Sequence, residues 1–237
     1  MISIIIPVLN EAQIIEQLIQ HLVDSSSTIT VSEIIIVDGG STDKTRTIVE
    51  HFIDKNTSNK KPNVIFIVSE KGRAKQMNTG TKYATGTIYY FLHADSFPPK
   101  HFDKFIIEAV KKGHKAGCFR MQFDSNHWWL RLASWLTQFS WRACRGGDQS
   151  QFITKTLFED IGGYDERYVI YEDNILINEL YARNEYLVIN KKIHTSARLY
   201  KKHGIWKLQY HFWTIYIKRW FGATADELLA YYKKHIC

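Results

Sequence analysis

Acidic side chains follow apolar stretches at several points of this chain, and one of them stands near a histidine. The stretch Phe91-Leu92-His93-Ala94-Asp95-Ser96 comes at the end of a strand-forming run over residues 87–92. A hydrophobic strand that ends on His-x-Asp places polar groups at its carboxyl tip, where open α/β sheets bind ligands. Further carboxylates lie within residues 7–11, within residues 37–43 and at Glu172-Asp173. Together these groups predict an enzyme that handles a phosphorylated donor through a divalent cation.

Asp38 is a candidate ligand-binding residue. It follows four apolar residues and precedes Gly39 and Gly40, where backbone without side chains lets a ligand approach closely. A carboxylate in this place can accept a hydrogen bond from a base or a ribose. Asp38 could instead cap the helix expected to follow, but Ser41 or Thr42 is better placed for capping. We therefore expect Asp38 to contact a ligand.

Asp95 is the candidate metal ligand. Mg²⁺ and Mn²⁺ prefer oxygen ligands and are commonly held by one or two carboxylates plus substrate phosphates, so Mn²⁺ or Mg²⁺ is the expected cofactor. The alternative is that Asp95 caps the segment before Pro98-Pro99. His93 is open between two interpretations, a side chain that points into the site and one that contacts a neighbouring strand.

Arg73 opens a predicted helix, where free backbone N–H groups and the guanidinium could both meet a diphosphate. An arginine opposes the helix dipole at that end, and a bound anion would remove the conflict; a solvated surface arginine is the alternative. Glu172 and Asp173 also begin a predicted helix, and they could simply complement its dipole. In a cleft that holds a cation and phosphates, one of them could serve as general base.

Strands and helices alternate through the first half of the chain, which predicts a parallel, doubly wound α/β sheet flanked by helices. Beyond Lys100 the pattern is mixed, and we expect one domain that ends in aromatic helices. The expected strands cover residues 2–9, 33–37, 63–68, 87–92, 116–123 and a short segment through 152. The expected helices cover residues 11–23, 42–53, 74–84, a segment up to 111, 128–141 and 174–183, with a loop over residues 54–62 and a turn at 146–147.

Composition narrows the class of protein. The formal charge of +7 fits nucleic acid, anionic lipid or a polyphosphate ligand, but the basic residues are scattered, so nucleic acid is not an expected partner. Cys118, Cys144 and Cys237 lack any C-x-x-C spacing, so neither a disulfide framework nor a zinc site is encoded and a reducing cytoplasm fits. The start lacks a basic leader, and no apolar run reaches about 18 residues. We expect neither export nor a membrane span.

A helical stripe of large apolar residues lies near the C-terminus, with Lys207, Lys218 and Arg219 beside it. Such an amphipathic helix can lie on a membrane surface, which opens a peripheral membrane contact through residues 203–221. Burial against the sheet or a partner subunit is the commoner fate of such stripes, and a homo-oligomer is also open. Residues 128–139 have the same ambiguity. The stripe consists of Trp206, Tyr210, Trp213, Ile217 and Trp220.

Six motifs in order give the chain a resemblance to glycosyltransferase family 2, with the A-type nucleotide-diphospho-sugar transferase fold. The resemblance covers nearly the whole chain. The motifs are Ile4-Ile5-Ile6-Pro7-Val8-Leu9-Asn10-Glu11, Ile36-Val37-Asp38-Gly39-Gly40-Ser41-Thr42-Asp43, Gly72-Arg73-Ala74-Lys75-Gln76-Met77-Asn78, Phe91-Leu92-His93-Ala94-Asp95-Ser96, Phe158-Glu159-Asp160-Ile161-Gly162-Gly163-Tyr164 and Glu172-Asp173.

The resemblance implies a transferase that moves a sugar from a nucleoside-diphosphate sugar, with uridine the expected base and guanosine second, to the hydroxyl of a saccharide, lipid or small-molecule acceptor. It implies that Asp95 matches the last carboxylate of the family's D-x-D metal motif. Asp173, with Glu172 next in line, matches the general base of inverting members. The residues implied at the nucleotide and donor are Pro7, Glu11, Asp38, Gly39, Arg73, Gln76, Asn78 and His93.

By the same resemblance, residues 1–99 form the nucleotide-sugar-binding half, residues 100–200 the acceptor and catalytic half, and residues 201–237 the C-terminal amphipathic helices. The expected location is the cytoplasm, with the inner face of the membrane open.

His93 departs from the family pattern, because it stands where many relatives carry the first Asp of D-x-D. A histidine there weakens a hard-oxygen metal site. A subgroup of the family resembles this variant and shares Thr195-Ser196-Ala197-Arg198. The neighbouring His194 is either a metal ligand on a strand late in the sequence or an exposed strand residue. Two alternatives stay open: a nucleotidyltransferase, against which the loop after the first strand argues, and a degenerate transferase that binds a nucleotide sugar or a membrane partner without turnover.

Overall fold

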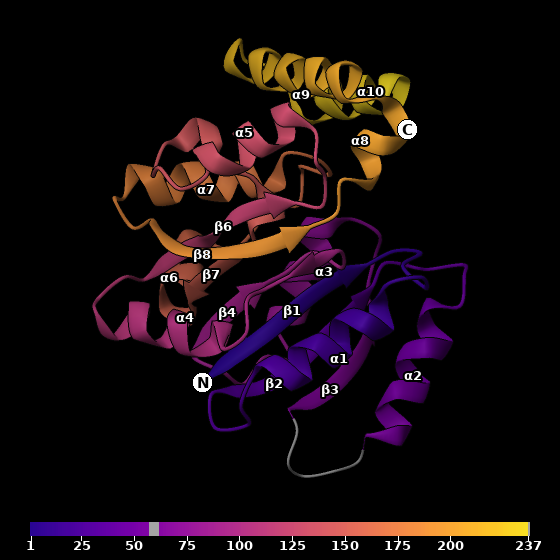
Figure 1. Cartoon of the computed structure of the whole chain (residues 1–237), viewed down its shortest axis with the longest axis vertical. Helices are drawn as coiled ribbons and strands as arrows, with labels where there is room; N and C mark the ends of the chain where they lie inside the picture. Colours follow the sequence, from indigo (N-terminus) through magenta and orange to yellow (C-terminus); the bar gives the residue numbers. More distant parts are fainter. Residues whose placement is uncertain (57–61, 237) are drawn as a thin grey trace.

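The computed structural model describes residues 1–56 and 62–236. Eight strands form one sheet in the order β3-β2-β1-β4-β7-β6-β8-β5, which runs through the middle of the molecule (Figure 1). The strands are β1 (Ile2–Val8), β2 (Val31–Asp38), β3 (Asn63–Val68), β4 (Ile88–Phe91), β5 (Ser96–Phe97), β6 (Ala116–Phe123), β7 (Gln151–Thr154) and β8 (Leu187–Thr195).

The strands from β3 to β4 all pair in parallel, so the predicted α/β fold class and the mostly parallel sheet are confirmed. β7 enters antiparallel between β4 and β6, β8 runs parallel to β6, and the two-residue β5 is antiparallel to β8. Neither β5 nor β8 is among the predicted strands. A two-residue strand such as β5 leaves no period-2 pattern in the sequence.

Helices cover both faces of the sheet. Apolar residues of β1, β2 and β4 that point to one face pack against α1, α2 and α4, and those that point to the other pack against α3, α6 and α7. The helices are α1 (Ile15–Ser25), α2 (Thr45–Lys55), α3 (Arg73–Thr81), α4 (Phe102–Lys111), α5 (Trp128–Leu136), α6 (Lys155–Ile161), α7 (Glu172–Ala182), α8 (Arg198–His203), α9 (Ile205–Trp220) and α10 (Ala225–His235).

Several helix boundaries differ from the prediction. The helix expected over residues 11–23 begins at Ile15, after a turn at residues 12–14. Two further differences have identifiable reasons. The helix expected from Thr42 begins at Thr45, and neither Ser41 nor Thr42 caps it: Ser41 donates to Asp38, and the Thr45 backbone N–H donates to Asp43 Oδ1 at 2.9 Å. The aromatic helix expected to reach Trp141 ends at Leu136, and the chain continues through 3-10 turns at Arg142–Cys144 and Gly147–Gln149. The loop predicted over residues 54–62 is helical at its start, and residues 57–61 lie outside the described chain.

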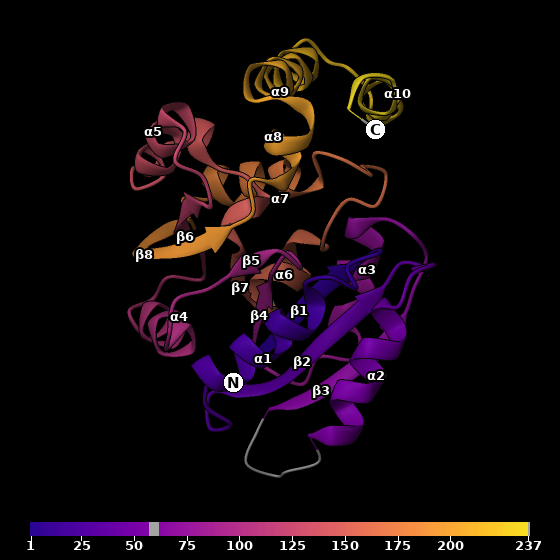
Figure 2. The same ribbon diagram turned by 45° about the vertical axis from the view of Figure 1, so that its right-hand side comes forward.

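The last helices form a separate layer at the end of the molecule opposite α2 and β3 (Figures 1 and 2). Their apolar side chains form a small core together with two residues from the loop before α7. The helices supply Leu208, Ile215, Leu228 and Ile236, and the loop supplies Tyr168 and Ile170. Within residues 1–56 and 62–236, no helix combines the length and apolarity needed to cross a membrane.

Candidate active site

The carboxyl ends of the central parallel strands meet, as the sequence predicted. Val8 of β1 lies beside Asp38 of β2, and Ile5 lies beside Phe91 of β4. The segments that follow these strands therefore bring Glu11, Asp38 and the pair His93 and Asp95 to one edge of the sheet. This is the edge where ligands bind in open α/β folds.

Asp38 is buried, and its carboxylate holds the turn that follows it. It accepts hydrogen bonds from the backbone N–H groups of Gly40 and Ser41, at 3.1 and 3.0 Å, and from the Ser41 hydroxyl. Ser41 Oγ in turn accepts from the Asn10 backbone N–H at 2.9 Å. Asp38 therefore does not cap α2, and the contact with a nucleoside predicted for it stays a prediction.

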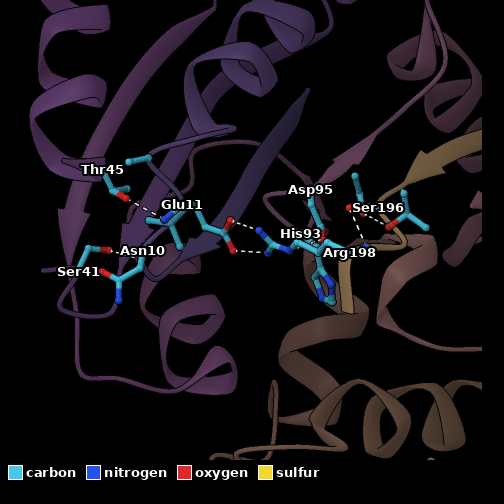
Figure 3. A network of polar contacts seen from close by, with 12 residues as sticks. Asn10, Glu11, Ser41, Thr45, His93, Asp95, Ser196 and Arg198 are labelled. Carbon is cyan, nitrogen blue, oxygen red and sulfur yellow. Dashed lines mark hydrogen bonds and ion pairs between the residues drawn. The ribbon is translucent and has the colours of Figure 1, made fainter. Parts of the chain in front are cut away.

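Arg198 joins two of the predicted site residues. Its guanidinium donates to both carboxylate oxygens of Glu11, at 2.6 and 2.5 Å, and its Nε lies 3.3 Å from Asp95 Oδ2. Figure 3 shows the guanidinium between the two acids. Antiparallel pairing of Ser96 with Thr195 brings α8 to this position. Burial raises the pKa of Asp95 above its ordinary value, and the Arg198 charge opposes that rise.

His93 lies between two carboxylates. Its Nδ1 is 3.5 Å from Asp148 Oδ1, and its Nε2 is 3.7 Å from Asp173 Oδ2. Burial alone would lower the pKa of His93, but Asp148 and Asp173 outweigh burial and raise that pKa to about 10. His93 therefore carries a positive charge at neutral pH and points into the acidic cluster, which settles the orientation that the sequence left open.

Arg73 at the start of α3 faces the two acids at the start of α7. Its guanidinium lies 3.3 Å from Glu172 Oε1 and 3.8 Å from Asp173 Oδ2. The conflict between Arg73 and the dipole of its own helix is therefore offset by carboxylates of another helix. Glu172 is almost completely buried; burial raises its pKa to about 7, against the opposing charge of Arg73 and with a further rise from Asp173.

A small cavity of about 10 Å³, room for about one water molecule, lies beside this cluster. Asp173 and His93 supply its charged groups. The other residues that line it are Met77, Phe91, Gly146, Gly147, Ser150, Gln151, Tyr164, Leu176 and Ile177. Asp173 lines this cavity, whereas Asp95 and Asp38 do not.

Several residues predicted at the donor have structural contacts. Gln76 is buried, and its Nε2 donates to the carbonyls of Val8 and Val37 at 2.9 and 2.7 Å, which ties β1 to β2. A Cβ on Gly39 would lie 3.0 Å from the Gln76 amide, so Gly39 provides the space for this tie.

Asn78, Pro7 and His194 also have defined positions. Asn78 Oδ1 accepts from the Tyr164 N–H at 3.0 Å, and its Nδ2 donates to the Tyr164 carbonyl at 2.9 Å. Pro7 is buried in β1 beside Val37. The donor contacts predicted for Gln76, Gly39, Asn78 and Pro7 stay predictions. His194 is exposed on β8, as one of its two interpretations held.

Asp148 belongs to the cluster, and the sequence reasoning missed it. It lies in the turn at Gly147–Gln149, which buried Arg145 fixes by donating to the carbonyls of Thr137 and Phe139, both at 2.7 Å, and to Gln149 Oε1 at 2.6 Å. The signal available was an acid directly after two glycines, the same pattern in reverse as Asp38-Gly39-Gly40.

Solved structures share the open, mostly parallel α/β fold of this chain. Staphylococcus aureus TarS residues 1–349 in complex with UDP has a TM-score of 0.64 at 19% identity and covers 83% of this chain and 60% of its own. The mannosyltransferase PcManGT from Pyrobaculum calidifontis, in complex with GDP-Man and Mn²⁺, has a TM-score of 0.67 at 19% identity and covers 98% of this chain and 63% of its own.

Residues 3–165 match the glycosyl transferase family 2 profile, and the chain belongs to this family. It is 26% identical over 201 residues to the probable glycosyltransferase YdaM of Bacillus subtilis (strain 168), which covers 76% of this chain and 46% of YdaM. A dolichyl N-acetyl-alpha-D-glucosaminyl phosphate 3-beta-D-2,3-diacetamido-2,3-dideoxy-beta-D-glucuronosyltransferase of Methanococcus voltae is 31% identical over 112 residues, which is 47% of this chain and 34% of that protein. The chain spans less than half the length of these curated relatives.

Proposed function

We propose that this protein transfers a sugar from a nucleoside-diphosphate sugar to an acceptor hydroxyl. The observation that carries the proposal is the convergence of Asp173, His93 and Arg73 from three separate elements beside one cavity. Family membership supports the reaction class. The solved structures of the same fold hold UDP, UDP-GlcNAc or GDP-Man, which supports a sugar nucleotide as donor, with a uridine nucleotide first and a guanosine nucleotide second.

Asp173 is the proposed general base. It lines the cavity, whereas Glu172 is turned toward Arg73 and is almost completely buried. Asp173 takes the proton of the acceptor hydroxyl while the hydroxyl oxygen forms a bond to the anomeric carbon. The bond from that carbon to the diphosphate oxygen breaks, and the nucleoside diphosphate leaves with the electron pair. Attack from the face opposite the leaving group inverts the anomeric centre.

Cationic side chains support the donor side of the site. Arg73 Nη1 lies 3.8 Å and His93 Nε2 lies 3.7 Å from Asp173 Oδ2, and we propose that these two side chains stabilise the negative charge of a departing diphosphate. Glu11 and Asp38 follow the neighbouring strands β1 and β2, and we propose that they border the nucleoside.

A divalent cation, Mn²⁺ or Mg²⁺, fits this site only when it is shared with the donor. Across the described residues, no group of three His, Cys, Asp or Glu side chains could hold a metal ion. Asp95 offers carboxylate oxygens at the sheet edge, and one or two carboxylates with substrate phosphates are a common magnesium environment. When bound, the cation would neutralise charge on the diphosphate.

Calorimetric titration with UDP-, GDP-, CMP- and dTDP-sugars, each with and without Mn²⁺, tests the proposal. We expect one nucleotide series to bind and its affinity to increase with Mn²⁺. Binding of none of the four series would contradict the proposal. Binding without release of nucleoside diphosphate under any acceptor condition would instead favour a degenerate, binding-only protein.

A further inference from the structure

The aromatic stripe of α9 is exposed, so the expectation of burial against the sheet is wrong, whereas burial against a partner subunit stays an alternative. Tyr210 is 61% exposed, Ile217 52% and Trp220 87%. Trp206 and Trp213 lie on the same side of the helix and are also exposed. Exposed apolar surface of this extent on one side of a helix marks an interaction site.

Helix α5 extends this surface. The Trp129 ring lies 5.4 Å from the Trp206 ring and 5.9 Å from the Trp213 ring, and exposed Trp128 lies 5.8 Å from Trp206. The Trp129 indole N–H also donates to Gln209 Oε1 at 3.2 Å. We call the joint surface the aromatic face, and it consists of Trp128, Trp206, Tyr210, Trp213, Ile217 and Trp220.

The charged residues on α5 and α9, the two helices that carry the aromatic face, are all basic. Residues 198–220 contain six Lys or Arg and no Asp or Glu, and residues 125–136 contain Arg131 and no acid. Lys202, Lys207 and Lys218 are exposed. In a symmetric dimer the same patch meets itself, so two copies of this face would bring like charges together. A partner with negative charge and an apolar interior fits the face better.

We propose that the aromatic face docks on an anionic membrane surface. Tryptophan and tyrosine favour the level of the lipid headgroups, and lysine and arginine beside them are attracted to anionic lipids. An interfacial helix with aromatic residues on one side and basic residues at its flanks is the form that such docking takes. The helix lies on the membrane and does not cross it.

Docking at this face also orients the proposed active site. The Tyr216 ring of α9 lies 5.2 Å from the Tyr171 ring, and Tyr171 directly precedes Glu172 and Asp173. The proposed base is therefore connected to the docking helix through one ring contact. A transferase docked in this way would take its acceptor from the membrane. This consequence rests on the proposed transferase function, whereas docking itself does not.

Vesicle flotation tests the docking. The wild type is mixed with phosphatidylcholine vesicles, or with vesicles that also contain phosphatidylglycerol, at low and high salt. The test variant is Tyr210→Ser/Ile217→Ser/Trp220→Ser. The control variant Ile29→Ser/Val68→Ser/Tyr83→Ser removes three equally exposed apolar side chains of the first half of the chain. Circular dichroism and thermal unfolding check that each variant is folded.

We expect the wild type and the control to float with the anionic vesicles, more weakly at high salt. The vesicle-bound fraction of the test variant should be about tenfold or more below that of the wild type. A wild type that stays with neither vesicle, or a test variant that floats as well as the wild type, would overturn the proposal. Self-association would replace the proposal if the wild type binds no vesicles and sedimentation velocity shows it as a dimer and the test variant as a monomer. Release of nucleoside diphosphate by the same protein preparations, measured in the absence of vesicles, tests the transferase proposal separately.

Discussion

Gly147 lies directly against Asp173, so that a Cβ at position 147 would overlap Asp173 Oδ2 and crowd His93 Cε1. The 3-10 turn that contains Gly147 also carries Asp148, whose carboxylate faces the other nitrogen of the same imidazole. The backbone of this turn therefore sets the distance between the proposed base and its charged neighbours.

The Gly147→Ala variant tests this contact. Overpacking at a tight contact costs about 1–3 kcal/mol, and we expect a loss of that size in the free energy of unfolding measured by urea denaturation. The matched control is Gly146→Ala, because a Cβ there would meet no heavy atom of the described chain within 4 Å. Equal stability of the two variants would contradict the close approach of the turn to Asp173.

Glu172 gives stability a pH dependence of defined sign. Its pKa is raised from 4.5 to about 7 in the folded protein, so folding favours its protonated form. This contribution is complete below about pH 4.5 and is lost as the pH rises through about 7. The Glu172→Gln variant lacks the titration, and its unfolding free energy should gain on that of the wild type by at most about 1.4 kcal/mol per pH unit within this window.

Denaturation of the wild type and Glu172→Gln at a series of pH values checks this prediction. The series runs from about pH 4 to about pH 8, which spans the window between the two pKa values. Glu108→Gln is the control, because Glu108 is exposed and its pKa is lowered by Lys112. Wild-type and Glu172→Gln profiles that run parallel across the window would refute the prediction.

Asp95 should be needed for the effect of a cation on nucleotide binding. A ligand at about one hundred times its Kd adds about 2.7 kcal/mol to stability, and we expect UDP with Mn²⁺ to raise the wild-type Tm accordingly. In Asp95→Ala the part of this shift that depends on Mn²⁺ should disappear. Asp124→Ala, which removes an exposed acid near Lys201, should keep it. An unchanged Mn²⁺ effect in Asp95→Ala would remove Asp95 from the proposed metal site.

The sequence predicted the parallel strands of residues 1–99 well because their signals are local. The apolar runs that become β1, β2 and β4 end at Glu11, Asp38 and His93, and parallel pairing brings such ends together without further information. Arg198 and Asp148 could not be placed in this way. Their positions depend on the pairing of β5 with β8 and on the hydrogen bonds of Arg145, contacts between residues that are distant in sequence or hidden in an irregular turn.

The aromatic stripe shows a second limit of sequence reasoning. Periodicity locates the apolar side of α9 but does not say what that side meets. The core of the C-terminal layer is built instead from the opposite side of the helix, by Leu208 and Ile215. Only the tertiary arrangement shows that Trp220 and its neighbours are left exposed.

The most direct test of the account is release of nucleoside diphosphate from the donor sugar nucleotide identified by calorimetry, compared between the wild type and Asp173→Asn. Loss of a general base lowers turnover by about 10²–10⁴-fold, and we expect a fall of this size with donor Kd nearly unchanged, because Asp173 acts on the hydroxyl of the acceptor or of water. Turnover of Asp173→Asn within about threefold of the wild type would contradict the account and make Glu172 the next candidate.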